Sequence, residues 1–181
     1  MGFIDNSTDP TLPMFYNVVR AVGKQCPNVS DDVQLVQYLL LAFYDKALAS
    51  SPVYSRPKGQ MTVDGICGPV TLNWILKFQL DVNTRYPGTL AADNRVDRVR
   101  NKNLIGSFTK TAYTLAVLNK FVKKINLSAF MATPSAVPLQ SAATVPPPSS
   151  DVAAPPATKQ PATPDQLGEL LRKSRPRVGR F

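Results

Sequence analysis

The sequence predicts a mainly α protein, in which a small helical bundle is followed by a proline-rich extended linker and a short C-terminal helix. Apolar residues recur at helical spacing in four segments, and no segment shows the long alternation of a β-strand. The composition changes sharply near residue 132. We therefore expect an N-terminal arm over 1–12, a helical domain over 13–130, a linker over 131–162, and a short amphipathic helix with a basic tail over 163–181.

The domain is expected to contain helices over 13–25, 31–48, 69–80 and 108–125. Ser30 suits the N-cap of the second helix, and the aspartates that follow it lie where the helix dipole favours negative charge. The third and fourth helices carry apolar residues on one side. These patterns predict a bundle whose core is built from helix faces.

The third helix is introduced by the stretch VDGICGPVTLNWILKFQ, residues 63–79. Glycine accepts the positive φ of a tight turn, and proline suits the first position of a helix. The residues expected to form the turn and start the helix are Asp64, Gly65, Gly68, Pro69 and Thr71. Because Gly68 is not followed by lysine, and only two glycines are present, neither a P-loop nor a dinucleotide-binding turn is expected.

The composition argues against catalysis. The chain has no histidine, and its single glutamate, Glu169, lies near the C-terminus, so a hydrolase would depend on aspartates alone. Cys26 and Cys67 cannot complete a Cys–His pair or a zinc site by themselves. They either form a disulfide or remain buried thiols. We expect no catalytic residue, cofactor or metal.

The stretch 63–79 resembles the signature of peptidoglycan-binding-like domains, Val-Asp-Gly-x-x-Gly-Pro-x-Thr followed by an apolar helix that ends in Phe-Gln. The preceding helix is similar to that family's first helix through Val33, Val36, Gln37 and Leu40. The resemblance covers about 30–125. It implies a three-helix module whose turn-plus-helix unit often occurs twice.

A second copy of that unit is expected further along the chain. Setting IGSFT against ICGPVT aligns Gly106 with Gly68 and Thr109 with Thr71, and an apolar helix follows.

Two departures from the family suggest that its glycan groove is remodelled. The segments 49–62 and 80–104 are lengthened, and Cys67 stands where the family usually has an apolar residue.

The lengthened segments contain the candidate contact residues. Exposed tyrosine and arginine side chains recognise muropeptides or protein partners, although they also occur as ordinary surface residues. The candidates are Tyr54, Arg56, Arg85 and Tyr86. Trp74 is expected in the core rather than as a sugar platform, because apolar residues surround it on its helix.

The C-terminal part suggests attachment to a partner. Nine prolines between 134 and 164 favour an extended tether. The segment beyond it is either a solvated basic tail or a docking peptide with a leucine face and basic residues. The residues expected to dock are Leu167, Leu170, Leu171, Arg172, Arg175 and Arg177.

The net charge of +9 suits an anionic or acidic partner. Nucleic acid is disfavoured, because the basic residues are scattered and lack aromatic interleaving. The N-terminus shows no signal-peptide pattern, and no segment has the length and apolarity of a membrane span. We therefore expect synthesis in the cytoplasm and association with a virion or similar particle.

The expected function is that of a non-enzymatic structural and binding protein. It would belong to a bacteriophage tail or baseplate, or to an injection machine, and be anchored through its C-terminal arm. Its expected partners are other proteins of a large assembly and peptidoglycan. Two alternatives remain open: a cell-wall-binding accessory module of a bacterial envelope protein and, with less support, a peptidoglycan hydrolase.

Overall fold

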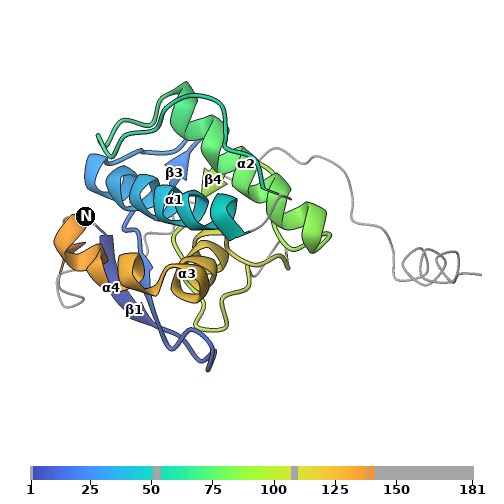
Figure 1. Cartoon of the computed structure of the whole chain (residues 1–181). Coiled ribbons are helices and arrows are strands. Elements are labelled where there is room, and N and C mark those ends of the chain that lie inside the picture. Colours follow the sequence, from blue (N-terminus) through green and yellow to red (C-terminus); the bar gives the residue numbers. More distant parts are fainter. Residues whose placement is uncertain (1, 51–53, 107–109, 138, 141–181) are drawn as a thin grey trace, which may run out of the picture. The chain divides into compact units, whose positions relative to one another are not determined.

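The computed structural model describes residues 2–50, 54–106, 110–137 and 139–140. In this part of the chain helices predominate over short strands, as the sequence predicts for a mainly α protein. The strands pair in two small sheets. Figure 1 shows the described helices, which are α1 (Ser30–Ser50), α2 (Pro69–Arg85), α3 (Thr114–Ile125) and α4 (Leu127–Ala136).

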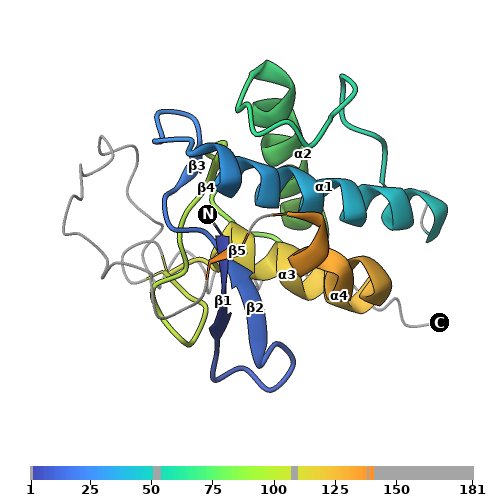
Figure 2. The ribbon, with the colours of Figure 1, turned by 90° about the vertical axis from the view of Figure 1, so that its left-hand side faces the viewer.

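The first sheet has the strand order β2-β1-β5, with bounds Met14–Asn17, Gly2–Asn6 and Leu139–Gln140. Strand β1 runs antiparallel to β2, with Ile4 opposite Tyr16, and parallel to β5 (Figure 2). The second sheet pairs β3 (Val22–Gly23) with β4 (Arg95–Val96) in antiparallel orientation. This short pairing ties the N-terminal segment to the loop between α2 and α3.

The expected N-terminal arm over 1–12 and helix over 13–25 are wrong, because this region forms strands β1, β2 and β3. Two local features oppose a helix over 13–25. Aromatic and β-branched residues favour strands, and Gln25 and Gly23 have φ of +57° and +127°. The apolar residues of this region are buried in and around the strands: Leu12, Phe15, Tyr16, Val18 and Val22.

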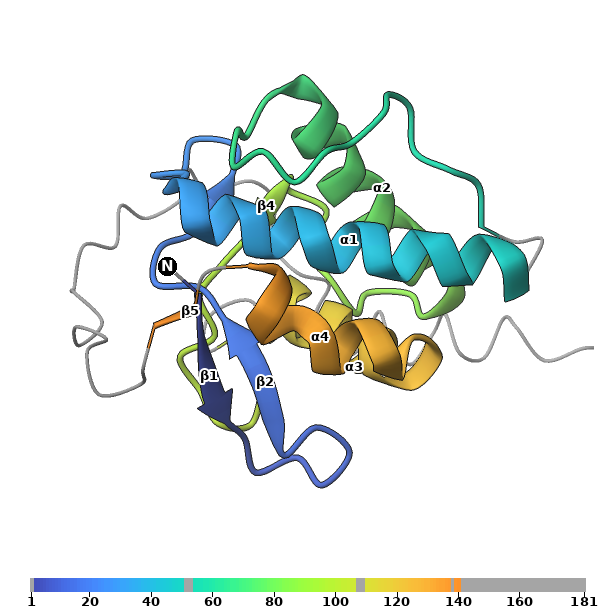
Figure 3. The same ribbon diagram turned by 60° about the vertical axis from the view of Figure 1, so that its left-hand side comes forward.

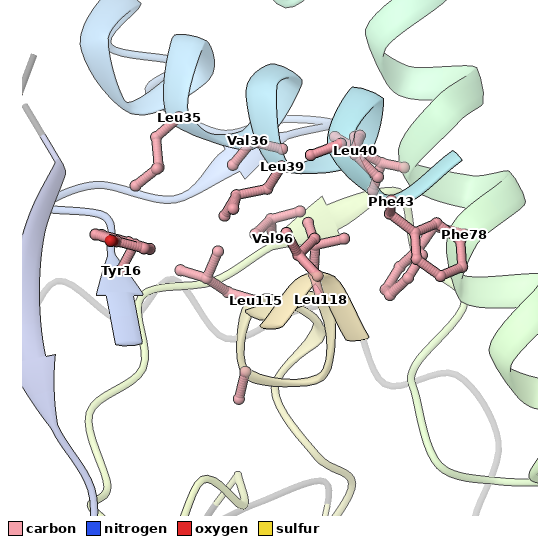
Figure 4. Packing of buried hydrophobic residues seen from close by; sticks show 14 of the residues in the cluster. Tyr16, Leu35, Val36, Leu39, Leu40, Phe43, Phe78, Val96, Leu115 and Leu118 are labelled. Carbon is pink, nitrogen blue, oxygen red and sulfur yellow. The ribbon is translucent and has the colours of Figure 1, made fainter. Parts of the chain in front are cut away.

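The core is centred on α1, which contacts α2, α3 and α4. Side chains from α1 point towards those of α3, α2 and β4 (Figure 4). Burying each large aliphatic or aromatic side chain contributes about 1.5–3 kcal/mol, before the entropy of ordering the chain is subtracted. The labelled core residues are Tyr16, Leu35, Val36, Leu39, Leu40, Phe43, Phe78, Val96, Leu115 and Leu118.

The sequence patterns do not predict helix α4, which extends past the expected domain boundary at 130 into the expected linker. Asn126 starts this helix, because its side chain accepts a hydrogen bond from the Ala129 N–H and donates one to the Ala42 carbonyl. Tyr38 of α1 donates to the Ala129 carbonyl at 3.0 Å. Figure 3 shows α4 beside α1 and α3. The remaining expected linker and the C-terminal helix, from 141 onward, lie outside the described residues.

Candidate functional site

The first feature of the candidate site is a loop held by the buried side-chain amide of Gln37 in α1. Its Oε1 accepts a hydrogen bond from the Gly65 N–H at 2.9 Å. Its Nε2 faces three oxygens: Asp64 Oδ1 at 2.8 Å, the Ile66 carbonyl at 3.1 Å and Thr71 Oγ1 at 3.1 Å. One side chain therefore joins α1 to the loop and to the first turn of α2.

One backbone position of this loop requires glycine. Gly65 has φ +75°, and an added Cβ would lie 2.2 Å from Ser30 Oγ. Asp64 tightens the turn by accepting the Ile66 N–H at 2.9 Å. These hydrogen bonds, from Ile66 first and then from Gln37, lower the pKa of Asp64 and keep it ionised.

Helix α2 begins directly after this loop. Gly68 is its N-cap, with extended backbone at φ −90°, and Pro69 is its first residue. The Thr71 hydroxyl donates to the Ile66 carbonyl at 3.1 Å and is 3% exposed. The stretch singled out in the sequence therefore forms a turn and a helix start, with its polar groups directed at one another.

A second loop repeats this arrangement around Gln79 of α2. Its Oε1 accepts hydrogen bonds from the Asp93 and Asn94 N–H groups at 3.2 and 3.0 Å. Its Nε2 faces Asp93 Oδ1 at 3.0 Å, the Arg95 carbonyl at 2.9 Å and Thr114 Oγ1 at 3.1 Å. The three Nε2 partners and the Asn94 N–H correspond in kind to the partners of Gln37, and the Asp93 N–H is an additional donor in the second loop.

The two loops also share their backbone geometry. Asn94 has φ +61°, in the same left-handed region as Gly65, and asparagine tolerates that region better than most residues. The Arg95 N–H donates to Asp93 Oδ1 at 2.9 Å, as Ile66 does to its aspartate. We call these two units the Gln37 turn and the Gln79 turn.

The expected alignment of the second copy is therefore wrong in register. Thr114 accepts a hydrogen bond from Gln79 as Thr71 does from Gln37, so Thr114 is the counterpart of Thr71. Thr109, the expected counterpart, lies outside the described residues. The second turn is Asp93–Asn94 rather than a turn at Gly106. Six positions separate turn from threonine in the first copy and twenty in the second. The insertion hides the repeat from sequence alignment, although Gln79 itself stands in the Phe-Gln ending of the motif.

The second feature brings together three of the four candidate contact residues. Arg85 is the last residue of α2 and Tyr86 is its C-cap, while Tyr54 follows α1, and Tyr86 contacts Phe121 of α3. The Tyr86 and Phe121 rings are stacked, with centroids 6.4 Å apart and planes 24° apart. The Arg85 guanidinium lies 5.9 Å from the centre of the Tyr86 ring. We call Tyr54, Arg85, Tyr86 and Phe121 the aromatic–arginine surface.

Buried rings support this surface from beneath. Phe43 contacts the Tyr54 ring edge-on at 5.4 Å and the Phe121 ring at 5.8 Å. The fourth candidate, Arg56, is directed elsewhere, because its guanidinium pairs with Asp45 of α1 at 3.1 Å. The pKa of Arg85 is raised, first by its hydrogen bond to Tyr86 and then by the nearby Tyr54. This exposed side chain therefore carries its charge at every physiological pH.

The two cysteines are partly buried and the tryptophan is fully buried. Cys26 and Cys67 are free, half-buried thiols, and burial raises the pKa of both. A raised pKa leaves little nucleophilic thiolate near neutral pH. Trp74 is fully buried, as expected, and its indole N–H donates to the Gly59 carbonyl at 3.1 Å.

Within the described ranges, no group of three or more acidic or cysteine side chains is arranged to hold a metal ion. None of the described helices is both long and apolar enough to cross a membrane. The candidate docking residues of the tail, over 163–181, fall outside the described part of the chain. No family model, curated protein or solved structure matches this chain.

Proposed function

We propose that this chain is a non-enzymatic structural and binding protein built on a peptidoglycan-binding-like module, and that it serves in a bacteriophage tail, baseplate or related injection machine. One observation carries the proposal: the turn-plus-helix unit occurs twice, and around both Gln37 and Gln79 the amide bonds an aspartate, a backbone carbonyl and a threonine hydroxyl. A doubled unit of this kind is what the resemblance at 63–79 implies.

The carboxylates of the two turns support a non-catalytic role. Asp64 and Asp93 each accept hydrogen bonds from a glutamine amide and from a backbone N–H. Asp32, which is buried, accepts the N–H groups of Val19 and Arg20. Each of these oxygens holds a loop in place, whereas a glycoside hydrolase needs two carboxyl groups facing a shared substrate.

The role in a particle rests on the C-terminal sequence. The proline-rich segment and the leucines and basic residues of 163–181 suit a tethered docking peptide. A tether raises the effective concentration of a weak docking segment near its partner. Deleting 163–181 should therefore prevent incorporation of the chain into the particle, and normal incorporation of the shortened chain would contradict this part of the proposal.

Co-sedimentation with purified peptidoglycan sacculi tests the wall-binding role. The full chain should sediment with sacculi, and binding should persist as salt is raised from about 0.05 to 0.5 M, where exposed charge pairs are largely screened. Chitin, which shares the amino-sugar backbone but lacks carboxylates, serves as a reference polymer. Binding that disappears at moderate salt would reduce the interaction to charge attraction and contradict the proposal. Release of soluble muropeptides would contradict its non-enzymatic part.

A further inference from the structure

The aromatic–arginine surface is built from three segments that lie far apart in the sequence. Tyr54 follows α1, Arg85 and Tyr86 lie at the end of α2, and Phe121 lies in the third turn of α3. Two of these segments are the ones that lengthen the chain relative to the peptidoglycan-binding signature. The surface shares no residue with the Gln37 turn or the Gln79 turn.

The surface is held rigidly from below. Phe43 and Phe78, both fully buried, meet edge to face at 5.1 Å, and Figure 4 shows their rings side by side. Phe78 also contacts Phe121 edge-on at 6.3 Å. Because these rings hold Phe121, the Tyr86 ring that stacks on it has less conformational freedom to lose on binding a ligand.

The exposed groups combine an aromatic face with a cation. The Tyr86 side chain is 46% exposed, which is high for a large aromatic residue. Arg85 is exposed as well and, among the described residues, forms no ion pair with a carboxylate. Arg56, by contrast, is neutralised by Asp45. Arg85 is thus available to an external anion, beside the exposed part of a Tyr86 ring that also contacts Phe121 and the Arg85 guanidinium.

This chemistry selects a class of ligand. Arginine binds carboxylates through paired, charge-assisted hydrogen bonds, and an exposed tyrosine ring offers apolar contact and a polar hydroxyl together. A nucleic-acid strand would need several cations along a track to neutralise successive phosphates, whereas Lys77, the nearest lysine on α2, is already paired with Asp81. A sugar polymer with widely spaced carboxylates fits one cation beside an aromatic face.

We propose that the aromatic–arginine surface is a glycan-binding site, in which a pyranose ring packs on Tyr86 and a carboxylate of the same polymer binds Arg85. The ligand is an amino-sugar polymer bearing carboxylates, the chemistry of peptidoglycan. This inference rests on the proposed function and deepens it by giving the site. Tyr54 and Phe121 border the sugar contact and exclude water from it.

Calorimetric titration of the full chain tests the site. The probes are muramidase-solubilised peptidoglycan fragments and chitotetraose, which lacks carboxylates. Truncating a central aromatic or arginine contact commonly weakens binding by roughly tenfold or more. Tyr86→Ala should therefore weaken binding of both probes about tenfold, and Arg85→Gln should weaken binding of the acidic fragments alone. Lys24→Gln removes the same charge from the exposed turn after β3 and should leave both dissociation constants unchanged.

The outcomes separate this site from the proposed function. If the Tyr86→Ala and Arg85→Gln chains, with circular dichroism and thermal midpoints like the parent, bind fragments and sacculi as the parent does, the site assignment is wrong while wall binding stands. If the parent chain binds neither sacculi nor fragments, both the wall-binding role and the site assignment are wrong. If both variants keep fragment binding but are lost from the particle, the surface is a protein interface and the glycan assignment is again wrong.

Discussion

Gln37 and Gln79 show why one residue type is needed at the centre of each turn. A carboxamide offers a donor and an acceptor on one short side chain, and both turns use both. Glutamate would lose the donor that faces the carbonyls of Ile66 and Arg95. The Gly65 N–H is buried and depends on the Gln37 carboxamide for its hydrogen bond, whereas the Ile66 carbonyl also accepts the Gly68 N–H and the Thr71 hydroxyl.

Replacing a central glutamine should destabilise the fold strongly. Gln37→Leu keeps the size of the side chain but leaves the Gly65 N–H without its acceptor and removes the donor to Thr71. Each buried group left unsatisfied costs about 1–3 kcal/mol, so a loss of roughly 3 kcal/mol or more is expected. Urea unfolding measures it. Gln34→Leu, one turn earlier and half-buried, is the matched control, and a similar loss in both variants would contradict the role of Gln37.

The two glycines of the motif should respond differently to alanine. Gly65 combines positive φ with a clash at Ser30, so Gly65→Ala should lower the free energy of unfolding by about 2 kcal/mol or more. At Gly68 the backbone is extended and a Cβ would meet nothing within 4 Å, so Gly68→Ala should change stability by less than about 1 kcal/mol. Thermal unfolding of both variants checks the difference, and equal losses would refute this account of the turn.

At the scale of elements, helices α1 and α2 could be predicted because their apolar spacing and start signals are local. The Gln79 turn could not, since its threonine lies twenty positions after Asn94 and only the folded chain brings them together. The strands near the N-terminus were missed for a related reason. A few buried apolar residues fit helical spacing and strand pairing alike, and only the pairing of β2 with β1 decides between them.

The aromatic–arginine surface was partly predictable. Tyr54, Arg85 and Tyr86 stand in polar, lengthened segments, which marked them as exposed. Phe121 was missed because it lies on a helix whose other apolar residues point to the core. Phe121 lies at the edge of that apolar stripe, three residues after Leu118 and four before Ile125, so its spacing alone indicates a core position.

Helix α4 contains Pro134, which cannot donate a hydrogen bond to the carbonyl of Phe130 one turn earlier. That carbonyl is instead satisfied by the Tyr16 hydroxyl from β2, at 2.8 Å. The proline and the tyrosine are thus complementary. The Phe130 carbonyl, which has no donor within its own helix, accepts the hydrogen bond that joins α4 to β2.

A double-mutant cycle tests this fastening. Tyr16→Phe should destabilise the parent by about 1–3 kcal/mol, because it leaves the buried Phe130 carbonyl without a donor. In a Pro134→Ala background the residue at 134 supplies an N–H of its own, so the same tyrosine change should cost less. Chemical denaturation of the four proteins gives the coupling energy. A coupling near zero would mean that the proline and the hydroxyl act independently.

For the whole molecule, the buried tyrosines make the free energy of unfolding depend on pH. Burial raises the pKa of Tyr16, Tyr38 and Tyr44 above the ordinary value of about 10. Tyr44 donates to Asp81 Oδ2 at 2.8 Å, and the proximity of that carboxylate adds to the increase in its pKa. In the unfolded chain these phenols ionise freely, so the folded state binds more protons at alkaline pH.

This difference fixes the direction of alkaline unfolding. A pKa that is higher in the folded state gives stability that is complete below the unfolded pKa and is lost as pH rises through the folded pKa. The free energy of unfolding should therefore fall from about pH 10 upward, by up to about 1.4 kcal/mol per pH unit for each such tyrosine. Denaturant titrations between pH 8 and 11, followed by phenolate absorbance, measure the slope. Tyr44→Phe should make it shallower while leaving Asp81 paired with Lys77. An unchanged slope would show that lysine deprotonation, and not the buried phenols, controls alkaline stability.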